Sequence, residues 1–526
     1  MIRVSRKVTE IVSQGIAEKM SLIGGEGFHV HAPADETKNG FMTKEDKKAM
    51  NQRTSLATPN TIMQRDSSGR AKVNAPVAAD DIARKQEVDA VGSRVDRIIA
   101  DGDSSAEVVD ARGNYPVLSA RLDASDTETV KKSEIAANVL DFGAKGDGVT
   151  NDTAAFQAAI NTGRKVVVPW TPNGYLVGSI NCGDNTEIVG ENTVELLGVS
   201  SYVFGIAATG CNISGFKFNM MYGPVNAAAI LLRTSVKVCY LIRLKRLRFI
   251  NCYYGILDES GNSNFVTDIQ MIDCNFIVTK GPQIKINRSA GFVLLRDVNV
   301  DNNYNPWPVT WHSMHFEDFA GLEFERVDVV GTNHELVSPE YNPNSWGIYL
   351  KGKDLSNVSV WMNRVLIDSH KGDGIYIENV LNLWTKDVQI YHSYGKQLEM
   401  KNVKVAQSTN LLAMGPKGLP NATEDNHAIL LTNCDQMSIS NLYAGNSRGT
   451  GVVLVNCKDN IFTNVQVRDN SNYGWYEIDS DRNVVVGANL ANNAGGSLNQ
   501  TGAASAFVNW LNNGAYRASD VGAVTV

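Results

Sequence analysis

The chain has 526 residues, a formal net charge of −7 and a pI near 5.7, a balance that argues against binding to the phosphate backbone of nucleic acid. Its length exceeds one ordinary globular core, so we expect either several domains or one elongated solenoid. Seven cysteines without a CxxC pair predict neither a disulfide framework nor a zinc site, and 45 glycines favour short strands and tight turns.

Residues 1–137 differ from the rest, because short amphipathic segments alternate there with polar connectors, as in an attachment stalk. Val88, Val91, Val95 and Ile98 have a spacing that predicts a short coiled-coil seam, able to support a trimer that a larger domain holds together. The N-terminal segment MIRVSRKVTEIVSQG lacks the apolar core of a signal peptide, and no run reaches the ~18 apolar residues of a membrane span. We therefore expect no membrane insertion.

Three segments follow one another in this region: HVHAPADETKNGFMTKEDKKAMN (29–51), TIMQRDSSGRAKVNAPVAADDIARKQEVD (61–89) and EVVDARGNYPVLSARLD (107–123). They resemble tail-fibre and tail-appendage proteins of bacteriophages, the third in a form associated with phages of Gram-positive hosts. The resemblance implies a homotrimeric phage tail protein. Its N-terminal region would contact other tail or baseplate proteins of the virion, and the protein would act at the bacterial cell surface.

His29 and His31 form a His-x-His pair near the start of the first of these segments. In a trimeric fibre, three such pairs can enclose one divalent transition metal with six imidazoles. A pair of ordinary loop histidines is about three times more frequent on general grounds. We expect no required cofactor for this protein, and the sequence does not decide whether this pair binds a divalent metal.

The rest of the chain is organised around residues 138–160, NVLDFGAKGDGVTNDTAAFQAAI. Three glycines allow positive φ in a tight loop, where Asp147 and Asn151 can bond local amides. A short helix is expected to begin at Asn151 or Asp152, and the segment KVVVP after Gly163 is expected to be a buried strand. The apolar residues of that helix have helical spacing: Ala155, Phe156, Ala159 and Ile160.

This segment resembles the opening motif of the pectate-lyase-like right-handed parallel β-helices, which include phage tailspikes and polysaccharide-degrading enzymes. In that family the helix covers the open end of the β-helix, which would otherwise expose apolar core and unpaired strand edge. The match departs mainly at Asn151, where the family more often has Asp. The resemblance implies an all-β fold, a single-stranded right-handed parallel β-helix after a helical or irregular stalk. It implies no catalytic residue, because the motif is structural.

From residue 141 to 496 short apolar segments recur roughly every 25 residues, a pattern typical of a parallel β-helix. The clearest are AAILL at Ala228, GILDE at Gly255, GIYLK at Gly347, GIYIE at Gly374, AILLT at Ala428, GVVLV at Gly451 and GWYEI at Gly474. About ten coils stacked ~4.8 Å apart would give a rod roughly 50 Å long. We predict a stalk over 1–137, a β-helix over 138–496 with its cap at 138–165, and a short C-terminal segment over 497–526.

Alternation along these segments sorts side chains into inward and outward positions. With Ile256, Ile348 and Ile375 inward, one outward column is predicted to contain Leu257, Lys285, His315, Tyr349, Tyr376, Glu399 and Leu430. The column beside it is predicted to contain Glu259, Asn287, Glu317, Lys351, Glu378, Lys401 and Thr432. The middle of this face is rich in acids and aromatic rings, whereas the end near Leu430 is not.

Hydrolysis of a glycosidic bond needs two carboxyl groups, one to protonate the leaving oxygen and one to activate water or attack. Strand geometry places Glu378 about 8 Å from Glu399 and about 10 Å from Glu317, and either pair suits inversion. Asp368 and Asp373 lie in the turn IDSHKGDG and are expected to face the same groove as Glu378, although turns also favour Asp for local hydrogen bonds. The catalytic candidates are Glu317, Glu378, Asp368, Asp373 and Glu399, with Asp328 as a further one.

Aromatic rings beside these acids offer flat apolar faces on which sugars can stack. Two lengthened turns, rich in Trp, Tyr, Pro and Asn, contain Trp307, Trp311, His312 and Tyr341, which could wall a carbohydrate groove or pack on the scaffold. The predicted substrate-binding residues are His315, Trp346, Tyr349, Lys351, Tyr376 and Trp311. Any one of them can also be an ordinary side chain of a solvated β-helix face.

The leading hypothesis is a tailspike that binds and hydrolyses a bacterial surface polysaccharide, either capsule or wall teichoic acid. A polysaccharide lyase would instead use a base such as Arg364, Lys351, His315 or Tyr349, often with calcium, for which no contiguous acidic motif is visible. A third possibility is a non-catalytic receptor-binding or structural tail fibre with the β-helix as a rigid spacer. A secreted pectinase does not explain the three stalk segments.

Overall fold

The computed structural model describes residues 136–259, 264–277, 280–301, 311–331, 345–355, 357–416, 426–502, 504–512 and 515–521, together with residues 43, 45, 48, 51, 67–68 and 88–95. The chain divides into two units, Met1–Thr129 and Val130–Val526. In the first unit, residues 88–95 are helical and Val88, Val91 and Val95 are exposed. The predicted seam therefore lies on a helix, and the trimer that it was expected to support stays a prediction.

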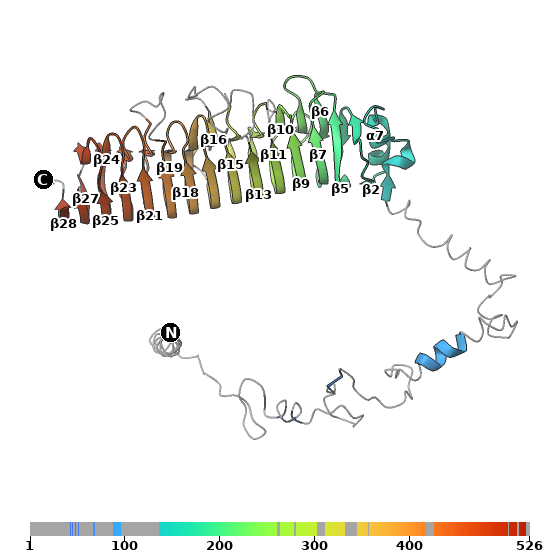
Figure 1. Cartoon of the computed structure of the whole chain (residues 1–526), viewed down its shortest axis with the longest axis horizontal. Coiled ribbons are helices and arrows are strands. Elements are labelled where there is room, and N and C mark those ends of the chain that lie inside the picture. Colours follow the sequence, from blue (N-terminus) through green and yellow to red (C-terminus); the bar gives the residue numbers. More distant parts are fainter. Residues whose placement is uncertain are drawn as a thin grey trace. The chain divides into compact units, whose positions relative to one another are not determined.

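The second unit begins with the expected cap (Figure 1). Strand β1 (Ala136–Asn138) leads into the 3-10 helix η1 (Val139–Phe142), and the helix α7 (Thr153–Asn161) follows a glycine loop. Asp152 is the N-cap of α7, and its carboxylate accepts hydrogen bonds from the amides of Lys145 at 2.7 Å and Gly146 at 3.1 Å. Gly146 has a φ of +59°, and a Cβ there would lie 2.6 Å from Thr171, so only glycine fits. The loop is thereby tied to the start of the helix.

The apolar stripe of α7 is buried as predicted, at Ala155, Phe156, Ala159 and Ile160. Phe156 meets Tyr175 edge to ring at 5.3 Å, which joins the helix to the first turns of strands. The amides of Val149 and Thr150 bond the Asp147 carboxylate, and these bonds lower the pKa of Asp147 to about 2. The cap is thus a packed structural element, as the sequence indicated.

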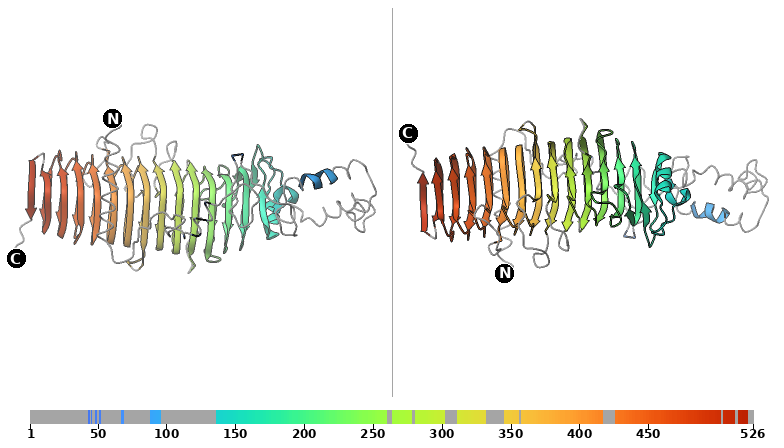
Figure 2. Two further views of the ribbon diagram at one scale, coloured as in Figure 1. Left: turned by 90° about the horizontal axis from the view of Figure 1, so that it is seen from below. Right: turned by 90° about the horizontal axis from the view of Figure 1, so that it is seen from above.

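Two parallel ladders follow the cap. Ladder A consists of β4 (Ile180–Cys182), β6 (Tyr202–Ile206), β8 (Ala228–Leu232), β10 (Tyr254–Asp258), β12 (Ile284–Ile286), β14 (Met314–Glu317), β16 (Trp346–Lys351), the first parts of β18 (Asp373–Tyr391) and β19 (Leu398–Met414), β20 (Ile429–Thr432), β22 (Val452–Val455), β24 (Tyr473–Ile478) and β26 (Gly496–Thr501). Successive strands pair in parallel, so the chain makes a right-handed parallel β-helix of about 13 turns (Figures 1 and 2).

Ladder B consists of β1, β2 (Lys165–Val168), β5 (Glu187–Gly198), β7 (Asn212–Asn219), β9 (Cys239–Ile250), β11 (Val266–Ile277), β13 (Ser289–Asp301), β15 (Phe319–Val330), β17 (Ser359–Asp368), the later parts of β18 and β19, β21 (Met437–Gly445), β23 (Ile461–Arg468), β25 (Asp481–Leu490) and β27 (Ala504–Asn512). A short strand β3 (Tyr175–Val177) pairs with β5, and β28 (Ala515–Val521) pairs antiparallel with β27. The parallel pairing continues past Gly496, where the recognisable sequence repeats end.

The sequence repeats underestimated the number of turns. About ten were expected, and the ladder A strands that they missed are β4, β6 and β26. Their sequences are INC, YVFGI and GSLNQT, and of these only INC alternates strictly between buried and exposed residues. Short strands of the scaffold can therefore depart from strict alternation, which is the pattern that the sequence analysis relied on.

The strands of ladder B bend at one residue in the left-handed region. This corner column comprises Arg246, Asp273, Asp297, Arg326, Arg364, Asp387, Asn410, Asn441 and Asn464, with φ between 52° and 57°. The bend divides these ladder B strands into two faces. With ladder A, the cross-section therefore has three sides. Asn and Asp tolerate this conformation better than other non-glycine residues. Asn441 donates a hydrogen bond to Asn410 at 2.8 Å, and Asn464 donates to Asn441 at 2.8 Å, so part of this corner is a stacked amide ladder.

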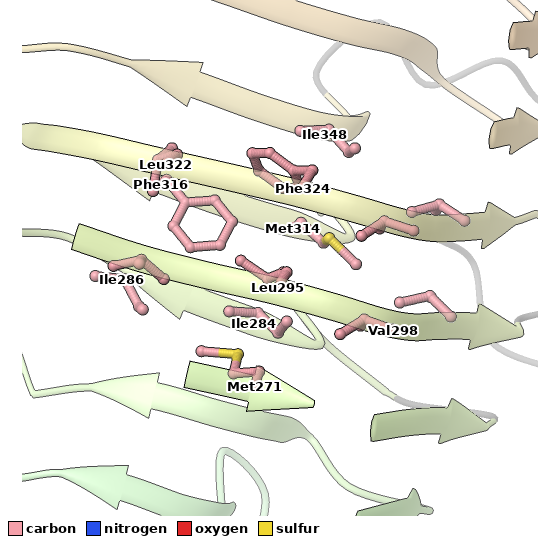
Figure 3. Close-up of a cluster of buried hydrophobic side chains, with 14 of the residues drawn as sticks. Met271, Ile284, Ile286, Leu295, Val298, Met314, Phe316, Leu322, Phe324 and Ile348 are labelled. Carbon is pink, nitrogen blue, oxygen red and sulfur yellow. The ribbon is translucent and has the colours of Figure 1, made fainter. Parts of the chain in front are cut away.

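Inward side chains fill the interior along the whole unit. Phe218, Phe249 and Phe276 stack in register, with ring centroids 5.1 and 4.4 Å apart. Further along, Met314, Phe316 and Phe324 continue the same packed interior (Figure 3). All seven cysteines are free and buried, which agrees with their expected role as small core residues. Packed apolar side chains therefore fill the interior in the described part of the chain.

Candidate functional site

The two predicted outward columns are present on ladder A. Strand pairing aligns Lys285, His315, Tyr349, Tyr376, Glu399 and Leu430 in one column, in the predicted order. The adjacent column aligns Glu317, Lys351, Glu378, Lys401 and Thr432. Ile256, Ile348 and Ile375 are buried, as the predicted alternation required. We call the two columns, between β14 and β19, the candidate site.

Aromatic rings form a continuous stack through the first column. Tyr349 stacks on Tyr376 with centroids 5.0 Å apart and planes 8° apart. On its other side Tyr349 stacks on His312 at 4.3 Å and contacts His315 at 5.0 Å. Trp346 packs against Tyr376 at 5.1 Å. Rungs ~4.8 Å apart match the spacing of stacked rings, so the scaffold itself sets this arrangement.

The histidines of this stack are partly buried and uncharged near neutral pH. Burial lowers the pKa of His312 to about 3, helped by the nearby His315 and Lys285. Burial and Lys285 lower the pKa of His315 to about 4. His312 Nδ1 accepts a hydrogen bond from the Trp346 amide at 3.1 Å, which fixes the ring. Neutral imidazoles of this kind can donate or accept a hydrogen bond.

Glu378 is the most contacted carboxylate of the site. The Tyr376 hydroxyl donates to Glu378 Oε2 at 2.9 Å, and the ammonium groups of Lys351 and Lys401 lie 3.8 and 3.6 Å from its oxygens. Its side chain is 13% exposed. Burial and the carboxylates of Glu317 and Glu378 raise the pKa of Tyr349 to about 12, and burial and the bond to Glu378 raise the pKa of Tyr376 further. Both phenols therefore stay protonated, and that of Tyr376 acts as a donor.

Glu317 and Glu399 flank Glu378 on opposite sides. Glu317 is two rungs away with Lys351 between them, and its side chain is 40% exposed, 3.7 Å from His315 Nε2. Glu399 lies one rung away on the other column, beside Tyr376, and its carboxylate pairs with Lys396 at 2.6 Å. This register gives the expected separations on strand geometry, about 10 Å between Glu317 and Glu378 and about 8 Å between Glu378 and Glu399. Lys396 was missed from the sequence, although its position three residues before Glu399 was a usable signal.

Asp373 does not share a groove with Glu378, contrary to expectation. Asp373 pairs with Trp346 at the start of the strand, whereas Glu378 pairs with Lys351 at its end, about 17 Å away on strand geometry. The Asp373 side chain is buried and accepts a hydrogen bond from the Lys396 amide at 2.7 Å. The sequence analysis left open that Asp373 forms a local hydrogen bond in its turn, and this structural role explains the burial.

Asp368 lies at the end of β17, on ladder B rather than on ladder A. Its carboxylate accepts a hydrogen bond from the Ser369 hydroxyl at 2.9 Å and lies 3.6 Å from His392 Nδ1. The expected grouping of Asp368 with Glu378 is wrong, because a turn and most of a ladder A strand separate them.

Trp346 is only 7% exposed, so it supports Tyr376 from below and offers no open face to a sugar, contrary to expectation. Trp311 is partly exposed at the start of the same region, and within the described residues its indole nitrogen has no hydrogen-bond partner. The other loop candidates, Trp307 and Tyr341, and the predicted metal pair, His29 and His31, lie outside the described residues. Among the residues that the structure describes, no group of three or more His, Cys, Asp or Glu could hold a metal ion.

The chemistry available at the site is that of carboxylates beside stacked rings. Two or three carboxylates lie within reach of one elongated ligand, protonated phenols and neutral imidazoles supply hydrogen bonds, and lysines supply positive charge. This combination suits a polar, ring-shaped ligand with many hydroxyl groups. Protonated Tyr349 is a poor base, which weighs against one of the four bases considered for a lyase.

Two family models match parts of the chain. Residues 136–202 match rhamnogalacturonase A/epimerase, pectate lyase-like, and residues 346–513 match the right handed beta helix region. These matches confirm the pectate-lyase-like right-handed β-helix that the cap and the repeats predicted. No curated protein matches the chain.

Several solved structures are similar at low identity. Pre-mature gene product 12 of bacteriophage phi29 is 13% identical, with a TM-score of 0.43 over 74% of this chain, and the chain spans only 54% of that protein. The Dettilon tailspike protein is 13% identical, with a TM-score of 0.44 over 70% of this chain and 68% of its own. The mannuronan C-5 epimerase AlgE6 A-module of Azotobacter vinelandii is 13% identical, with a TM-score of 0.38 over 70% of this chain and 98% of its own. Within the described part of this chain, no helix is long and apolar enough to span a membrane.

Proposed function

We propose that the protein is a phage tail appendage that binds a bacterial surface polysaccharide, capsule or wall teichoic acid, and hydrolyses it during adsorption. The observation that carries this proposal is the outward stack of His315, Tyr349 and Tyr376 with Glu317 and Glu378 beside it. Stacked rings bind sugars by their flat faces, and paired carboxylates are the groups that glycoside hydrolysis needs. The similarity of residues 136–202 to a rhamnogalacturonase and epimerase family agrees with a carbohydrate ligand.

In this proposal Glu378 activates a water molecule and Glu317 protonates the leaving oxygen. Tyr376 fixes one oxygen of Glu378, so that the other oxygen can accept a proton from water. The hydroxide adds to the anomeric carbon, the glycosidic carbon–oxygen bond breaks, and the proton from Glu317 goes to the leaving oxygen. A separation near 10 Å between the two strands leaves room for the water that inversion requires. Glu399 is the alternative acid, about 8 Å from Glu378.

The remaining predicted residues take supporting roles or none. Lys351 holds Glu378 from one rung away, and Trp346 supports the ring of Tyr376. Asp368 and Asp373 are excluded from the catalytic set that we propose, because their carboxylates serve turns away from Glu378. Attachment through residues 1–137 to a virion, and assembly as a homotrimer, belong to the same proposal and rest on the resemblance of three stalk segments to phage tail proteins.

The test is incubation of full-length protein with surface polysaccharide from candidate hosts. Size-exclusion chromatography then measures the chain length, and absorbance at about 235 nm detects an unsaturated uronic acid. Shortening without new absorbance is the expected result, and Glu378→Gln and Glu317→Gln should each lose about 100-fold or more in rate. Glu323→Gln, an outward acid of β15 on ladder B at the turn of Glu317, is the matched control and should keep full activity.

Other outcomes would replace the proposal. New absorbance would identify a lyase and move attention to His315. Binding without shortening would identify a non-catalytic adhesin, with the β-helix as a spacer. Full activity in both glutamine variants would remove the site assignment even if the polysaccharide were shortened.

A further inference from the structure

A second concave feature lies on ladder B, at the same turns as the candidate site but on another side of the β-helix. It is a groove of about 300 Å³ across β15, β17 and β18. Its lining residues are Asp328, Arg364, Val365, Leu366, Asp387 and Gln389. The volume is at the lower end of the range for small-molecule sites, which is about 300 to 1,000 Å³.

Strand pairing explains the shape of this groove. Asp328, Leu366 and Gln389 are consecutive members of one outward column, so an apolar side chain lies between two polar ones. Arg364 and Asp387 occupy the adjacent corner column, with φ of 56° and 54°. The groove thus has an apolar floor at Leu366 and polar groups on its sides and at the corner.

Arg364 differs from the arginine one rung before it in the corner column. The guanidinium of Arg326 has two carboxylate partners, because it forms ion pairs with Asp297 at 2.5 Å and with Glu325. In the described parts of the chain, neither the Arg364 guanidinium nor the Asp328 carboxylate has a hydrogen bond or an ion pair, although both line one groove. Opposite charges on adjacent rungs commonly pair on this surface, so two unpaired groups facing one groove are unusual here.

The other polar groups of the groove have capacity left. Asp387 accepts one hydrogen bond, from Asn410 at 2.6 Å, and its second oxygen has lone pairs to spare. Gln389 accepts a hydrogen bond from the Tyr391 hydroxyl at 3.3 Å through its carbonyl oxygen, which leaves the amide NH₂ for another partner. Asp328 is exposed to solvent, and desolvation by its neighbours raises the pKa of its carboxyl.

We propose that this groove is a second carbohydrate-binding site, which holds a neutral sugar residue without cleaving it. Sugar hydroxyls both donate and accept, so they can bond the carboxylates of Asp328 and Asp387 and the N–H groups of Arg364 and Gln389 at once. The apolar face of the sugar ring would lie on Leu366. Two carboxylates against one guanidinium disfavour an anionic sugar, and the guanidinium disfavours a metal ion.

The groove chemistry alone selects the ligand class, whereas its assignment to the same surface polysaccharide rests on the proposed function. A polysaccharide chain that wraps around the rod at these turns would meet both sites. Binding at the second site raises the effective concentration of the chain at the first, so the groove increases retention on the bacterial surface more than it increases the rate of cleavage.

The test compares full-length wild-type protein with the double variant Asp328→Asn/Arg364→Asn and the control Arg326→Asn. Asn is tolerated at corner positions, and Arg326 has the same residue type, column and φ region as Arg364 without lining the groove. Retention is measured on an array of purified bacterial capsular polysaccharides and wall teichoic acids, and cleavage is measured at saturating soluble polysaccharide. Loss of hydrogen bonds to charged groups should weaken retention of the double variant by about tenfold or more. Arg326→Asn should match wild type.

Several outcomes separate this proposal from the proposed function. Glu378→Gln should lose cleavage and keep retention, whereas the double variant should keep cleavage within about twofold, because its residues touch no group of the candidate site. In wild type, polysaccharide should also slow the modification of Arg364 by phenylglyoxal, followed by peptide mass spectrometry, without slowing that of Arg326.

Equal retention of wild type and double variant, or equal loss in Arg326→Asn, would overturn the second site while leaving the cleavage site intact. Loss of cleavage at saturating polysaccharide in the double variant would also overturn it, because the groove would then be catalytic. Retention that EDTA abolishes and calcium restores would make the groove a cation site. A change in sedimentation of the double variant would make it an interface between copies of the chain.

Discussion

Between β14 and β19, the outward column of ladder A carries His315, Tyr349, Tyr376 and Glu399, whereas between β20 and β24 the same column carries Leu430, Val453 and Tyr476. Both regions have the same parallel register and the same buried alternation beneath them. The fold therefore does not depend on which residues occupy the outward positions. Chemistry can be placed on a few rungs without a change in fold.

The two regions also differ in how regular their turns are. In the C-terminal turns, a backbone N–H repeatedly donates a hydrogen bond to the side-chain oxygen of an asparagine 23 residues later. Ser447 donates to Asn470, Asn470 to Asn493 and Asn460 to Asn483, at 3.0 to 3.2 Å. Equal turn lengths allow such bonds to stack. The turns that precede β14 and β16 are longer and unequal, and ring stacks and ion pairs occupy the outward columns of ladder A there. Departure from the repeat thus coincides with the candidate site.

The largest expected effect tests whether the interior is equivalent in the two regions. Phe316 and Phe462 are both fully buried and each meets another ring edge to face, Phe324 at 5.9 Å and Trp475 at 4.9 Å. Phe316→Ala and Phe462→Ala should each lower the free energy of unfolding by about 3–5 kcal/mol, measured by denaturant unfolding. Only Phe316→Ala should also lower polysaccharide cleavage at a temperature where both variants are folded, because this residue lies between His315 and Glu317. Equal loss of cleavage in both would mean that the regions are coupled.

The next effect isolates one hydrogen bond of the site. Tyr376→Phe keeps the ring stack and removes the hydroxyl that donates to Glu378. A hydrogen bond to a charged group is worth about 1.5–3 kcal/mol, so kcat/KM for polysaccharide should fall by about 10- to 100-fold. Tyr476→Phe, in the same column of the C-terminal region, is the control and should change nothing. A normal rate in Tyr376→Phe would show that Glu378 needs no such support.

The fold could be predicted from the sequence because it depends on local and periodic signals. Glycines at fixed positions and a small apolar helical stripe define the cap, and inward alternation fixed which face Tyr349 and Tyr376 would occupy. Three turns were missed because β4 is only three residues long and because β6 and β26 do not alternate strictly between buried and exposed residues. A periodic signal weakens when a strand is short or its alternation is broken.

The site could be predicted where it lies within one register and not where it depends on turns. The order of Glu317, Lys351 and Glu378 follows from strand pairing alone, and the structure has it. Asp373 and Trp346 were misplaced because both lie where a turn enters ladder A, and burial at such a point depends on how the turn folds over it. The groove at Asp328 was not predicted either, since it requires knowing that Arg364 and Asp387 share a corner.

A smaller effect tests a second asparagine ladder, at the ends of the ladder A strands, which runs from the C-terminal region into the candidate site. Asn456 has a φ of 51° and donates to Asn433 at 2.7 Å in a ladder that continues to Asn402 and Asn379. Asn456→Ala should lower the free energy of unfolding by about 1–2 kcal/mol, because a Cβ without a compensating bond disfavours this conformation. Asn456→Gly should cost less, since glycine adopts positive φ freely, and the difference between the two variants measures the backbone contribution. Equal losses would assign the whole effect to the amide ladder.

The most gradual effect is a pH dependence to which the candidate site contributes. Folding lowers the pKa of His312 to about 3 and that of His315 to about 4, from an ordinary value of 6.5, and burial lowers the pKa of His370, in the turn before β18, to about 3. Below pH 6.5 the unfolded chain gains protons that the folded protein does not, so this part of the stability is complete above pH 6.5 and is lost progressively as the pH falls toward 4. The midpoint of thermal unfolding should therefore fall between pH 6.5 and 5, a window chosen to precede protonation of most carboxylates.

The variant His312→Asn separates this contribution from the rest of the protein. The asparagine oxygen can replace Nδ1 as acceptor for the Trp346 amide, while the titratable group is removed. With one of three such histidines gone, the decline attributable to them should shrink by about a third. His392→Asn, at an exposed turn position with a φ of 52° that asparagine tolerates, is the control. An unchanged slope in His312→Asn would place the pH dependence in groups outside the candidate site, such as the buried His370, and the stacked histidines would then contribute nothing to the response to acid.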